Sequence, residues 1–297
     1  MKKLKIGYFA DGPWSHEALT RILSDETLEI RFICARSDNP DEILKSLAQK
    51  HGINFFTHPN VNSIEFLELV RPYKCDLFVS MSFNQIFKKK LIDLTPLKAI
   101  NCHAGKLPFY KGRNVLNWVL INDESEFGIT VHYMDEGIDT GDIILQKSFE
   151  IIDSDDYSTL LKTAYGECGS LLYESIKLLQ SGNQHTQKQM EIHPIGSYCR
   201  VRIQGDENLD WNTTSRQVFN FVRAICDPGP QARTWLRGHE VKINKIELLI
   251  NAPHYSGISG SVVGTEQGAF LVKTLDGLVR VTKWTGCALP KVGDRIK

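Results

Sequence analysis

Short apolar runs alternate with amphipathic stretches over residues 4–103, and this alternation limits the fold more than any other feature of the chain. The apolar runs have the length of strands, whereas the segments between them repeat apolar residues at helical spacing. The predicted strands are residues 4–10, 29–35, 53–57, 76–81 and 98–102, and the predicted helices are residues 15–24, 40–51 and 63–73. We expect Ser15 to cap the first helix, and Pro40 and Gly52 to bound the second. Strands separated by helices pair in parallel, so the sequence predicts an α/β fold with a doubly wound, mostly parallel sheet of about five to seven strands.

Open sheets of this kind bind ligands in the crevice at the carboxyl ends of their strands. Asp11, Ser82 and His103 all follow predicted strands directly. This edge of the sheet is therefore where we expect the site.

The turn after the first strand, "ADGPWS", argues against a dinucleotide-binding enzyme. It lacks the G-x-G-x-x-G pattern that lets the backbone approach a pyrophosphate, and Pro13 removes one amide donor. The turn still carries Trp14 and Ser15 at the start of a helix, whose amino end favours an anionic group. The alternative for Trp14 is packing between helix and sheet.

Residues 99–146 bring three kinds of polar side chain to the same edge. Asn101 and His103 are two residues apart on a strand, so both leave from one face. Residues 128–134 alternate as a second strand, and the turn-rich loop "DEGIDTGD" follows. That loop carries the carboxylates Asp135, Glu136, Asp139 and Asp142.

An amide, an imidazole and a carboxylate suit acyl transfer from an activated carbonyl to an amine. The amine loses a proton after attack and the carbonyl oxygen becomes an oxyanion, so the site needs a proton acceptor and an aimed donor. Asp139 suits the acceptor role and also the orientation of His103, and His103 and Asn101 suit the oxyanion. The structural alternatives are a loop cap at Asn101, a hydrogen-bonded turn residue at His103 and a turn end at Asp139.

Several motifs resemble the formyltransferase family that uses 10-formyltetrahydrofolate. They are the run Asn101-Cys102-His103, the "LP.YKGR" loop, "NW", "GIT.H" and "DEGIDTGDII", in that order. The family's catalytic Asn, His and Asp correspond to Asn101, His103 and Asp139. The resemblance implies a Rossmann-like formyltransferase domain, followed by a smaller, mainly β, OB-like C-terminal domain.

The stretch "HAGKLPFYKGRNVLNW" is most similar to enzymes that formylate dTDP-linked amino-dideoxyhexoses. The resemblance therefore implies a sugar N-formyltransferase acting on a dTDP-linked 4-amino-4,6-dideoxyhexose, with the 3-amino isomer as second choice. It also implies a part in the synthesis of O-antigen or another surface polysaccharide.

The same resemblance assigns residues to the cosubstrate, 10-formyltetrahydrofolate. In the family, the segment after the fourth strand lines the pterin pocket together with the loop of the catalytic Asp. The residues assigned in this way are Phe83, Asn84, Gln85, Ile86, Asp135 and Glu136. The run Lys88 to Lys90 is expected to be a solvated helix face.

A nucleotide-sugar carries a diphosphate between a base and a hexose, so its site needs a bidentate cation and an aromatic surface. Arg113 offers the bidentate group, Lys106 offers a point charge, and the nearby aromatic rings offer faces for stacking. The predicted nucleotide-sugar contacts are Trp14, Ser15, Lys106, Phe109, Tyr110, Arg113 and Asn114. The alternative is that Arg113 pairs with an acidic neighbour and the aromatic rings only pack.

The alternative function within the family is a methionyl-tRNA formyltransferase. Such enzymes carry a long basic insertion after the second strand, whereas this chain has the short, centrally acidic "ARSDNPDEILK". Lys plus Arg and Asp plus Glu are 35 each, so no overall charge attracts nucleic acid or an anionic membrane. We therefore expect neither as a partner.

The second half of the chain reads as one more strand and a long helix, followed by a change of character. Residues 141–151 form the strand, residues 155–182 the helix, and the polar segment after them a linker. The predicted domains are a catalytic domain at 1–184, a linker at 185–196 and a mainly β domain at 197–297. From residue 195 onward there are 14 basic and 9 acidic residues, which keeps tRNA binding open as an alternative.

The cysteines and the amino end place the chain among reduced, cytoplasmic proteins. Seven scattered cysteines without a C-x-x-C pair suit free thiols, and Cys102, which points away from its two neighbours, is expected to fill the core. His132, His185 and His193 lack a metal-ligand spacing, so we expect no metal and a structural role for His132. The amino end is neither a signal peptide nor an anchor. We also expect a homodimer.

Overall fold

The computed structural model describes residues 3–249 and 251–297, and the chain divides into two compact units. Unit 1 extends to Gly112 and also includes Phe127–Phe149 and Lys162–Cys199. Unit 2 comprises Arg113–Glu126, Glu150–Leu161 and Arg200–Lys297. The chain therefore crosses between the units several times, and each unit is assembled from separate stretches of sequence.

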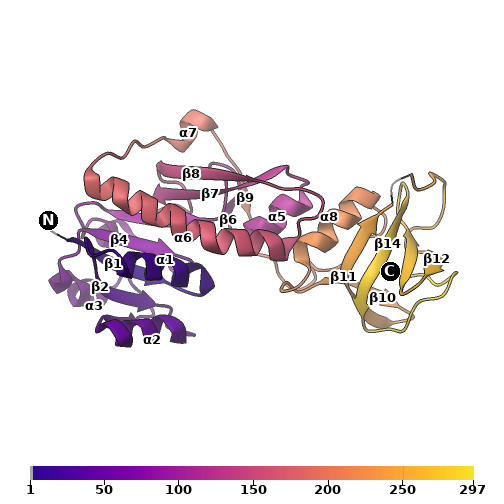
Figure 1. Ribbon diagram of the computed structural model, residues 1–297, viewed down its shortest axis with the longest axis horizontal. Helices are drawn as coiled ribbons and strands as arrows, with labels where there is room; N and C mark the ends of the chain where they lie inside the picture. The colour runs from indigo at the N-terminus through magenta and orange to yellow at the C-terminus, as the bar shows by residue number, and fades with distance from the viewer. Residues whose placement is uncertain (1–2, 250) are drawn as a thin grey trace. The chain divides into compact units, whose positions relative to one another are not determined.

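Unit 1 is built on a seven-stranded sheet with the strand order β3-β2-β1-β4-β5-β7-β8 (Figure 1). The first five strands in this order pair in parallel, whereas β7 runs antiparallel to β5. This confirms the predicted α/β fold with a mostly parallel, doubly wound sheet. The strands are β1 Leu4–Ala10, β2 Leu28–Ala35, β3 Asn54–Thr57, β4 Leu77–Met81, β5 Ala99–His103, β7 Glu126–Tyr133 and β8 Ile143–Glu150. A separate parallel pair joins β6 Lys111–Gly112 to β9 Tyr198–Cys199.

Two helix starts differ from the sequence prediction. Helix α1 begins at Pro13 with Gly12 as its N-cap, because proline is preorganised for the first helical position, and Ser15 is a buried residue within the helix. Helix α2 begins after Asp41, whose carboxylate accepts the Leu44 amide, and ends at the left-handed Gly52. The helical elements of this part of the chain are α1 Pro13–Leu23, α2 Glu42–His51, α3 Ile64–Val70, η1 Arg71–Tyr73, α4 Lys89–Ile92, α6 Tyr157–Ser181 and α7 Gln189–Ile192.

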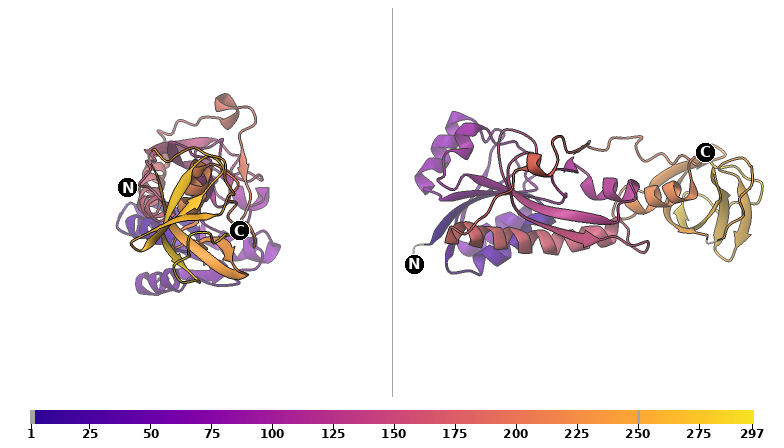
Figure 2. Two further views of the ribbon diagram at one scale, coloured as in Figure 1. Left: turned by 90° about the vertical axis from the view of Figure 1, so that its right-hand side faces the viewer. Right: turned by 90° about the horizontal axis from the view of Figure 1, so that it is seen from above.

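Alternate residues of β1 anchor the two faces of the sheet. The Tyr8 hydroxyl donates to the Ser15 carbonyl of α1, on the face along which α6 also runs (Figure 1). Phe9 points to the opposite face, where its ring lies 5.2 Å from Phe78 and 4.7 Å from Phe87. Full burial of each phenyl ring contributes about 1.5–3 kcal/mol. Helices pack on both faces of the sheet, and Figure 2 shows the same layers from two further sides.

In its described residues, unit 2 contains helices α5 and α8, the start of α6 and a five-stranded antiparallel sheet with the order β10-β11-β14-β13-β12. Its helices α5 and α8 pack together, and the Asn117 amide of α5 donates to the Ala224 carbonyl of α8. Thr214 and Gln217 form a capping box at the start of α8. The predicted mainly β character of the C-terminal part is confirmed. The elements are α5 Val115–Ile121, α8 Ser215–Ile225, β10 Ala232–Leu236, β11 His239–Leu248, β12 Val262–Glu266, β13 Ala269–Lys273 and β14 Leu278–Thr285.

The segment predicted as the linker, residues 185–196, belongs to unit 1 and is held by hydrogen bonds. Gln187 exchanges two backbone hydrogen bonds with Ile143 of β8, at 2.8 and 2.9 Å. Ser197, one residue beyond the segment, donates its amide to the Pro108 carbonyl. Domain boundaries at 184 and 196 remain a prediction about which parts of the chain fold on their own.

The cysteines are free thiols, as predicted. Cys102 is buried, and its Sγ lies 3.6 Å from the Cys168 carbonyl oxygen of α6, so it fills the core as expected. None of the helices in the described ranges is long and apolar enough to cross a membrane.

Candidate active site

The ends of two neighbouring strands bring Asn101, His103 and Asp139 together. Asn101 and His103 lie on the last three residues of β5, and Asp139 lies on the loop between β7 and β8. The His103 Nδ1 atom is 3.6 Å from the Asp139 Oδ2 atom. Both side chains are largely buried, with exposed fractions of 10% and 12%. The predicted convergence of an imidazole and a carboxylate at this edge therefore exists in the folded chain.

His132, which was expected to have a structural role, also lies in this cluster. The antiparallel register of β5 and β7 places His132 directly opposite Asn101. Its Nε2 atom lies 3.3 Å from the Asn101 Nδ2 atom and 3.5 Å from the Asp139 Oδ1 atom. His132 is thus a buried link between the amide and the carboxylate.

Backbone carbonyls assign the tautomers of the two imidazoles. His103 Nε2 lies 2.7 Å from the Tyr110 carbonyl, and His132 Nδ1 lies 2.7 Å from the Tyr133 carbonyl. A carbonyl only accepts, so each of these nitrogens carries the proton. The other nitrogen of each ring faces Asp139, and it can donate to the carboxylate only when the ring carries a proton on both nitrogens. The carboxylate is therefore placed to exchange a proton with either ring.

Asp139 is held in a left-handed conformation, with a φ of 54°, and this conformation aims its carboxylate between the two rings. The Gly112 amide donates to its Oδ2 atom at 2.9 Å. Burial raises the pKa of Asp139, but the charge of His103, the hydrogen bond and charge of His132 and the Gly112 amide together outweigh it. The net effect holds the pKa of this carboxyl below its ordinary value of 3.8, so Asp139 stays ionised in mildly acidic solution.

Hydrogen bonds from polar side chains of β7 and β8 hold the loop that follows His103. The Thr130 hydroxyl donates to the Gly105 carbonyl at 2.7 Å, and the Gln146 amide donates to the Leu107 carbonyl at 2.8 Å. These bonds hold the loop so that the Tyr110 carbonyl faces His103. No local sequence pattern points to Thr130 and Gln146 as residues that support this loop.

The predicted nucleotide-sugar contacts within unit 1 are only partly open to a ligand. Ser15 is fully buried and donates to the Gly12 carbonyl, whereas the Trp14 ring packs edge-on against Tyr165, with centroids 4.8 Å apart. The Phe109 ring lies 5.0 Å from the ring of His193. Tyr110 supplies the carbonyl that binds His103, and Lys106 lies against Gly128 of β7.

Arg113 and Asn114 directly follow the residue whose amide binds Asp139, and both are exposed. Asn114 accepts the Arg202 amide through its Oδ1 atom. No ion pair joins Arg113 to a carboxylate in the described part of the chain. The alternative in which Arg113 pairs with an acidic neighbour therefore has no such pair to support it.

The residues assigned to the folate side lie on two loops that a backbone amide connects. Gln85 is committed to the neighbouring backbone, because it donates to the His58 carbonyl and accepts the Val61 amide. Phe83 packs against Phe9, with ring centroids 5.6 Å apart. The remaining positions are as follows: Asn84 and Ile86 are exposed, Asp135 accepts the Gly137 amide and the Thr140 hydroxyl, and Glu136 accepts the Lys89 amide at 3.4 Å. Lys88 to Lys90 are exposed, as expected.

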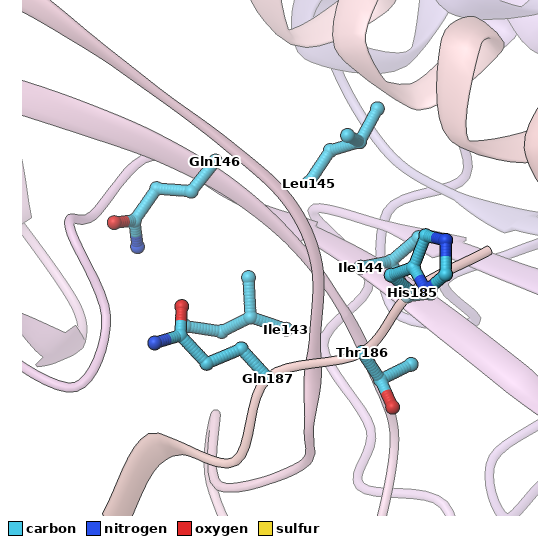
Figure 3. A pocket seen from close by; sticks show the side chains of 7 residues that line it. All are labelled: Ile143, Ile144, Leu145, Gln146, His185, Thr186 and Gln187. Atoms are coloured by element: carbon cyan, nitrogen blue, oxygen red, sulfur yellow. The ribbon is translucent and has the colours of Figure 1, made fainter. Parts of the chain in front are cut away.

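An open groove of about 440 Å³ lies along β8 (Figure 3). None of the predicted site residues lines it, and its walls are Ile143 to Gln146 and His185 to Gln187. Among the described residues, no group of three or more His, Cys, Asp and Glu side chains is arranged to hold a metal ion. The polar side chains that meet at this edge of the sheet are an amide, two imidazoles and a carboxylate.

These groups provide what acyl transfer to an amine requires. An ionised Asp139 can accept a proton, and Asn101 and His103 are placed on one face of β5 where they can donate to an oxyanion. His103 would exchange its bond to the Tyr110 carbonyl for a bond to the oxyanion.

Comparison with known families gives a consistent result for both parts of the chain. A family model described as formyl transferase matches residues 4–174, and a model of the formyl transferase C-terminal domain matches residues 203–286. A methionyl-tRNA formyltransferase of Pelobacter propionicus is 33% identical over 79% of this chain and 71% of its own length. Other curated relatives at 27–32% identity carry the same name.

Solved structures share the fold across nearly the whole chain. An N-formyltransferase from Helicobacter canadensis, solved with folinic acid and dTDP-3-aminofucose, has a TM-score of 0.70 at 23% identity. The alignment covers 96% of this chain and 100% of that one. A sugar 3N-formyl transferase solved with dTDP and 5-N-formyl-THF also has a TM-score of 0.70, at 22% identity, and the alignment covers 97% of this chain and 100% of that one.

Proposed function

The chain belongs to the formyl transferase family, and on this basis we propose that it transfers a formyl group from 10-formyltetrahydrofolate to the amine of a dTDP-linked 4-amino-4,6-dideoxyhexose. The convergence of Asn101, His103 and Asp139 at one edge of the sheet carries this proposal. The product would enter O-antigen or another surface polysaccharide. The 3-amino isomer is the second choice of acceptor.

The proposed reaction balances on these three side chains. The neutral amine forms a bond to the formyl carbon, and the carbonyl electron pair moves to the oxygen, where Asn101 and His103 donate hydrogen bonds. Asp139 accepts a proton from the new ammonium group. The oxyanion then collapses and the bond from the formyl carbon to N10 of the folate breaks. The proton held by Asp139 moves to N10, which leaves as the neutral amine of tetrahydrofolate and returns Asp139 to its ionised form.

Exposed apolar side chains on the two folate-side loops fit a flat heterocycle. Ile86 is 52% exposed on one loop and Ile138 is 50% exposed on the other. The bond from the Lys89 amide to Glu136 joins the two segments that carry them. Large apolar side chains left in water next to polar backbone are a common feature of ligand pockets. We propose that the pterin ring of the donor binds here.

Charge pairing supports a sugar acceptor over tRNA. After β2, Arg36 pairs with Asp38 at 2.6 Å, so this short connection offers no free basic group. A surface that binds RNA keeps its cations available for phosphates.

The names of the curated relatives favour methionyl-tRNA formyltransferase as the second candidate. One assay separates the candidates: formylation from 10-formyltetrahydrofolate, with the dTDP-linked 4-amino and 3-amino sugars and charged initiator tRNA as acceptors. We expect turnover of a sugar and none of tRNA. Turnover of tRNA alone would overturn the proposal. The homodimer stays a prediction, which sedimentation of the purified chain would check.

Arg113→Ala is expected to weaken acceptor binding by about 1.5–3 kcal/mol, the scale of a charge-assisted hydrogen bond. Arg113 is exposed beside the Gly112 amide that binds Asp139, so it can contact a diphosphate near the reacting amine. The acceptor KM should rise while donor affinity stays constant. Arg71→Ala is the matched control, because Arg71 is an exposed arginine on η1. An unchanged acceptor KM would show that Arg113 does not contact the acceptor.

The acid limb of kcat/KM is expected to follow the basicity of the acceptor amine. The pKa of Asp139 is lowered, so this carboxylate stays ionised as the pH falls through its ordinary range, while the amine becomes protonated and unreactive. Two acceptors with amines of different pKa should show acid limbs displaced by the same difference. An acid limb that does not move between acceptors would contradict this expectation, because it would belong to a group of the enzyme.

A further inference from the structure

Gln189, the first residue of α7, binds the backbone of the loop that carries Asp139. Its Nε2 atom donates to the Asp139 carbonyl and to the Gly141 carbonyl, each at 2.8 Å. The side chain is 6% exposed. Both protons of the Gln189 amide group therefore form hydrogen bonds to this loop. Gln189 lies 50 residues beyond Asp139 in the sequence.

The loop needs such support because its conformation is unfavourable by itself. Asp139 has a φ of 54°, in a region that side chains other than glycine seldom occupy. Gly141 lies so close to the Tyr133 carbonyl that a Cβ atom there would overlap it. The two carbonyls that Gln189 binds flank this constrained turn, so its bonds fix the direction in which the Asp139 carboxylate points.

The segment around Gln189 is itself anchored. Gln187 forms two backbone bonds with Ile143 of β8, and Figure 3 shows Gln187 beside Ile143 at this edge. At the other end, Ser197 binds the Pro108 and Lys111 backbone of the loop after His103. Gln189 thus lies between two fixed points, one at β8 and one at the loop beside His103.

The oxygen of the same side-chain amide differs from the nitrogen in its hydrogen bonding. Gln189 Oε1 is buried and has no hydrogen-bond partner in the described part of the chain. A buried acceptor without a donor is destabilising, and an apolar side chain of similar size would avoid that cost. The amide is therefore of use here for its two donated hydrogen bonds.

We propose that Gln189 is a positioning residue for the reaction: it holds the backbone of Asp139 so that the carboxylate lies between His103 and His132. This inference rests on the proposed function, because it takes Asp139 to be the proton acceptor. It predicts that loss of the two donors lowers the rate of transfer and leaves donor binding intact.

The test compares Gln189→Met, Gln189→Glu and the control Gln187→Met in the full chain. Methionine keeps the length and removes both donors, and Gln187 is a nearby glutamine that bonds through its backbone. We expect Gln189→Met to lower kcat about 10- to 10²-fold with an unchanged KM for 10-formyltetrahydrofolate, since small misplacement of a reacting group costs this much. Gln187→Met should retain the wild-type kcat.

Gln189→Glu supplies a readout that a merely structural role would not move. Ionised glutamate faces the two carbonyls with acceptors only, whereas the protonated acid can donate one hydrogen bond. The ratio of its kcat to that of the wild type should therefore rise as the pH falls. A ratio independent of pH, together with near wild-type kcat for Gln189→Met, would overturn the proposal.

Amide hydrogen exchange keeps this test separate from the test of function. The amides of residues 135–142 should exchange faster in Gln189→Met than in the wild type and in Gln187→Met, whichever acceptor the enzyme uses. Unchanged amide exchange would refute the positioning role of Gln189 even if the enzyme were active. Faster exchange in a chain that formylates no acceptor would instead reject the proposed function.

Discussion

Asp139→Asn is expected to lower kcat about 10²- to 10⁴-fold, the usual contribution of a positioned group that transfers a proton. Asparagine keeps the shape of the side chain and an oxygen for the Gly112 amide, which donates at 2.9 Å. It removes the negative charge that accepts the proton of the new ammonium group. The contacts to His103 and His132, at 3.6 and 3.5 Å, would then join neutral groups.

Single-turnover rates at saturating donor and acceptor are the measurement for this variant. Affinity for 10-formyltetrahydrofolate and the unfolding midpoint in urea are the controls, since the variant should bind and fold normally. His103→Ala should show a loss on the same scale, because it removes an oxyanion donor. Near-normal turnover of either variant, in protein shown to be folded, would contradict the assignment of the site.

Gly105→Ala is expected to lower kcat by about 10²-fold, although it adds only one methyl group outside the reacting set. A Cβ atom at Gly105 would overlap the His103 ring at Nε2 and would lie 2.5 Å from the Tyr110 carbonyl oxygen. The hydrogen bond from the Thr130 hydroxyl to the Gly105 carbonyl opposes a shift of the loop away from His103. The imidazole must move instead, away from Asp139.

The same overlap should lower the free energy of unfolding by about 1–3 kcal/mol, the usual cost of overpacking. Gly166→Ala is the matched control, because Gly166 lies on helix α6 with no atom within 4 Å of the added methyl group. There the change should be neutral or slightly stabilising. A Gly105→Ala enzyme with wild-type kcat would show that His103 can shift without loss of function.

Local patterns predicted the parts of this fold that depend on neighbouring residues. Apolar runs predicted the strands of unit 1, and the helical spacing of apolar residues predicted its helices. The mostly parallel sheet and the edge that carries Asn101 and His103 were therefore predictable from the sequence. The start of α1 was not, because Ser15 is a good capping residue, yet Pro13 takes the first helical position two residues earlier.

Contacts that depend on register or on distant segments could not be predicted in the same way. His132 reaches Asn101 only because β7 runs antiparallel to β5 with these two residues paired, and an alternating pattern does not specify a partner strand or a register. Gln189 lies in a polar segment without periodicity, which therefore resembled a linker. Its role becomes visible only once the chain returns to the loop of Asp139.

The interleaving of the two units affects how the chain can be made and divided. Helix α5 is synthesised about a hundred residues before its partner α8, and α6 lies between them in the sequence. During synthesis the apolar side of α5 therefore remains without α8 until that later part of the chain has been made. A fragment that ends at Cys199 would keep the seven-stranded sheet but lack α8, the helix that packs against α5 and its buried residues Val115, Leu116, Val119 and Leu120. The C-terminal residues are thus the missing half of a core begun by the N-terminal sequence, and a fragment without them is prone to aggregation rather than a minimal enzyme.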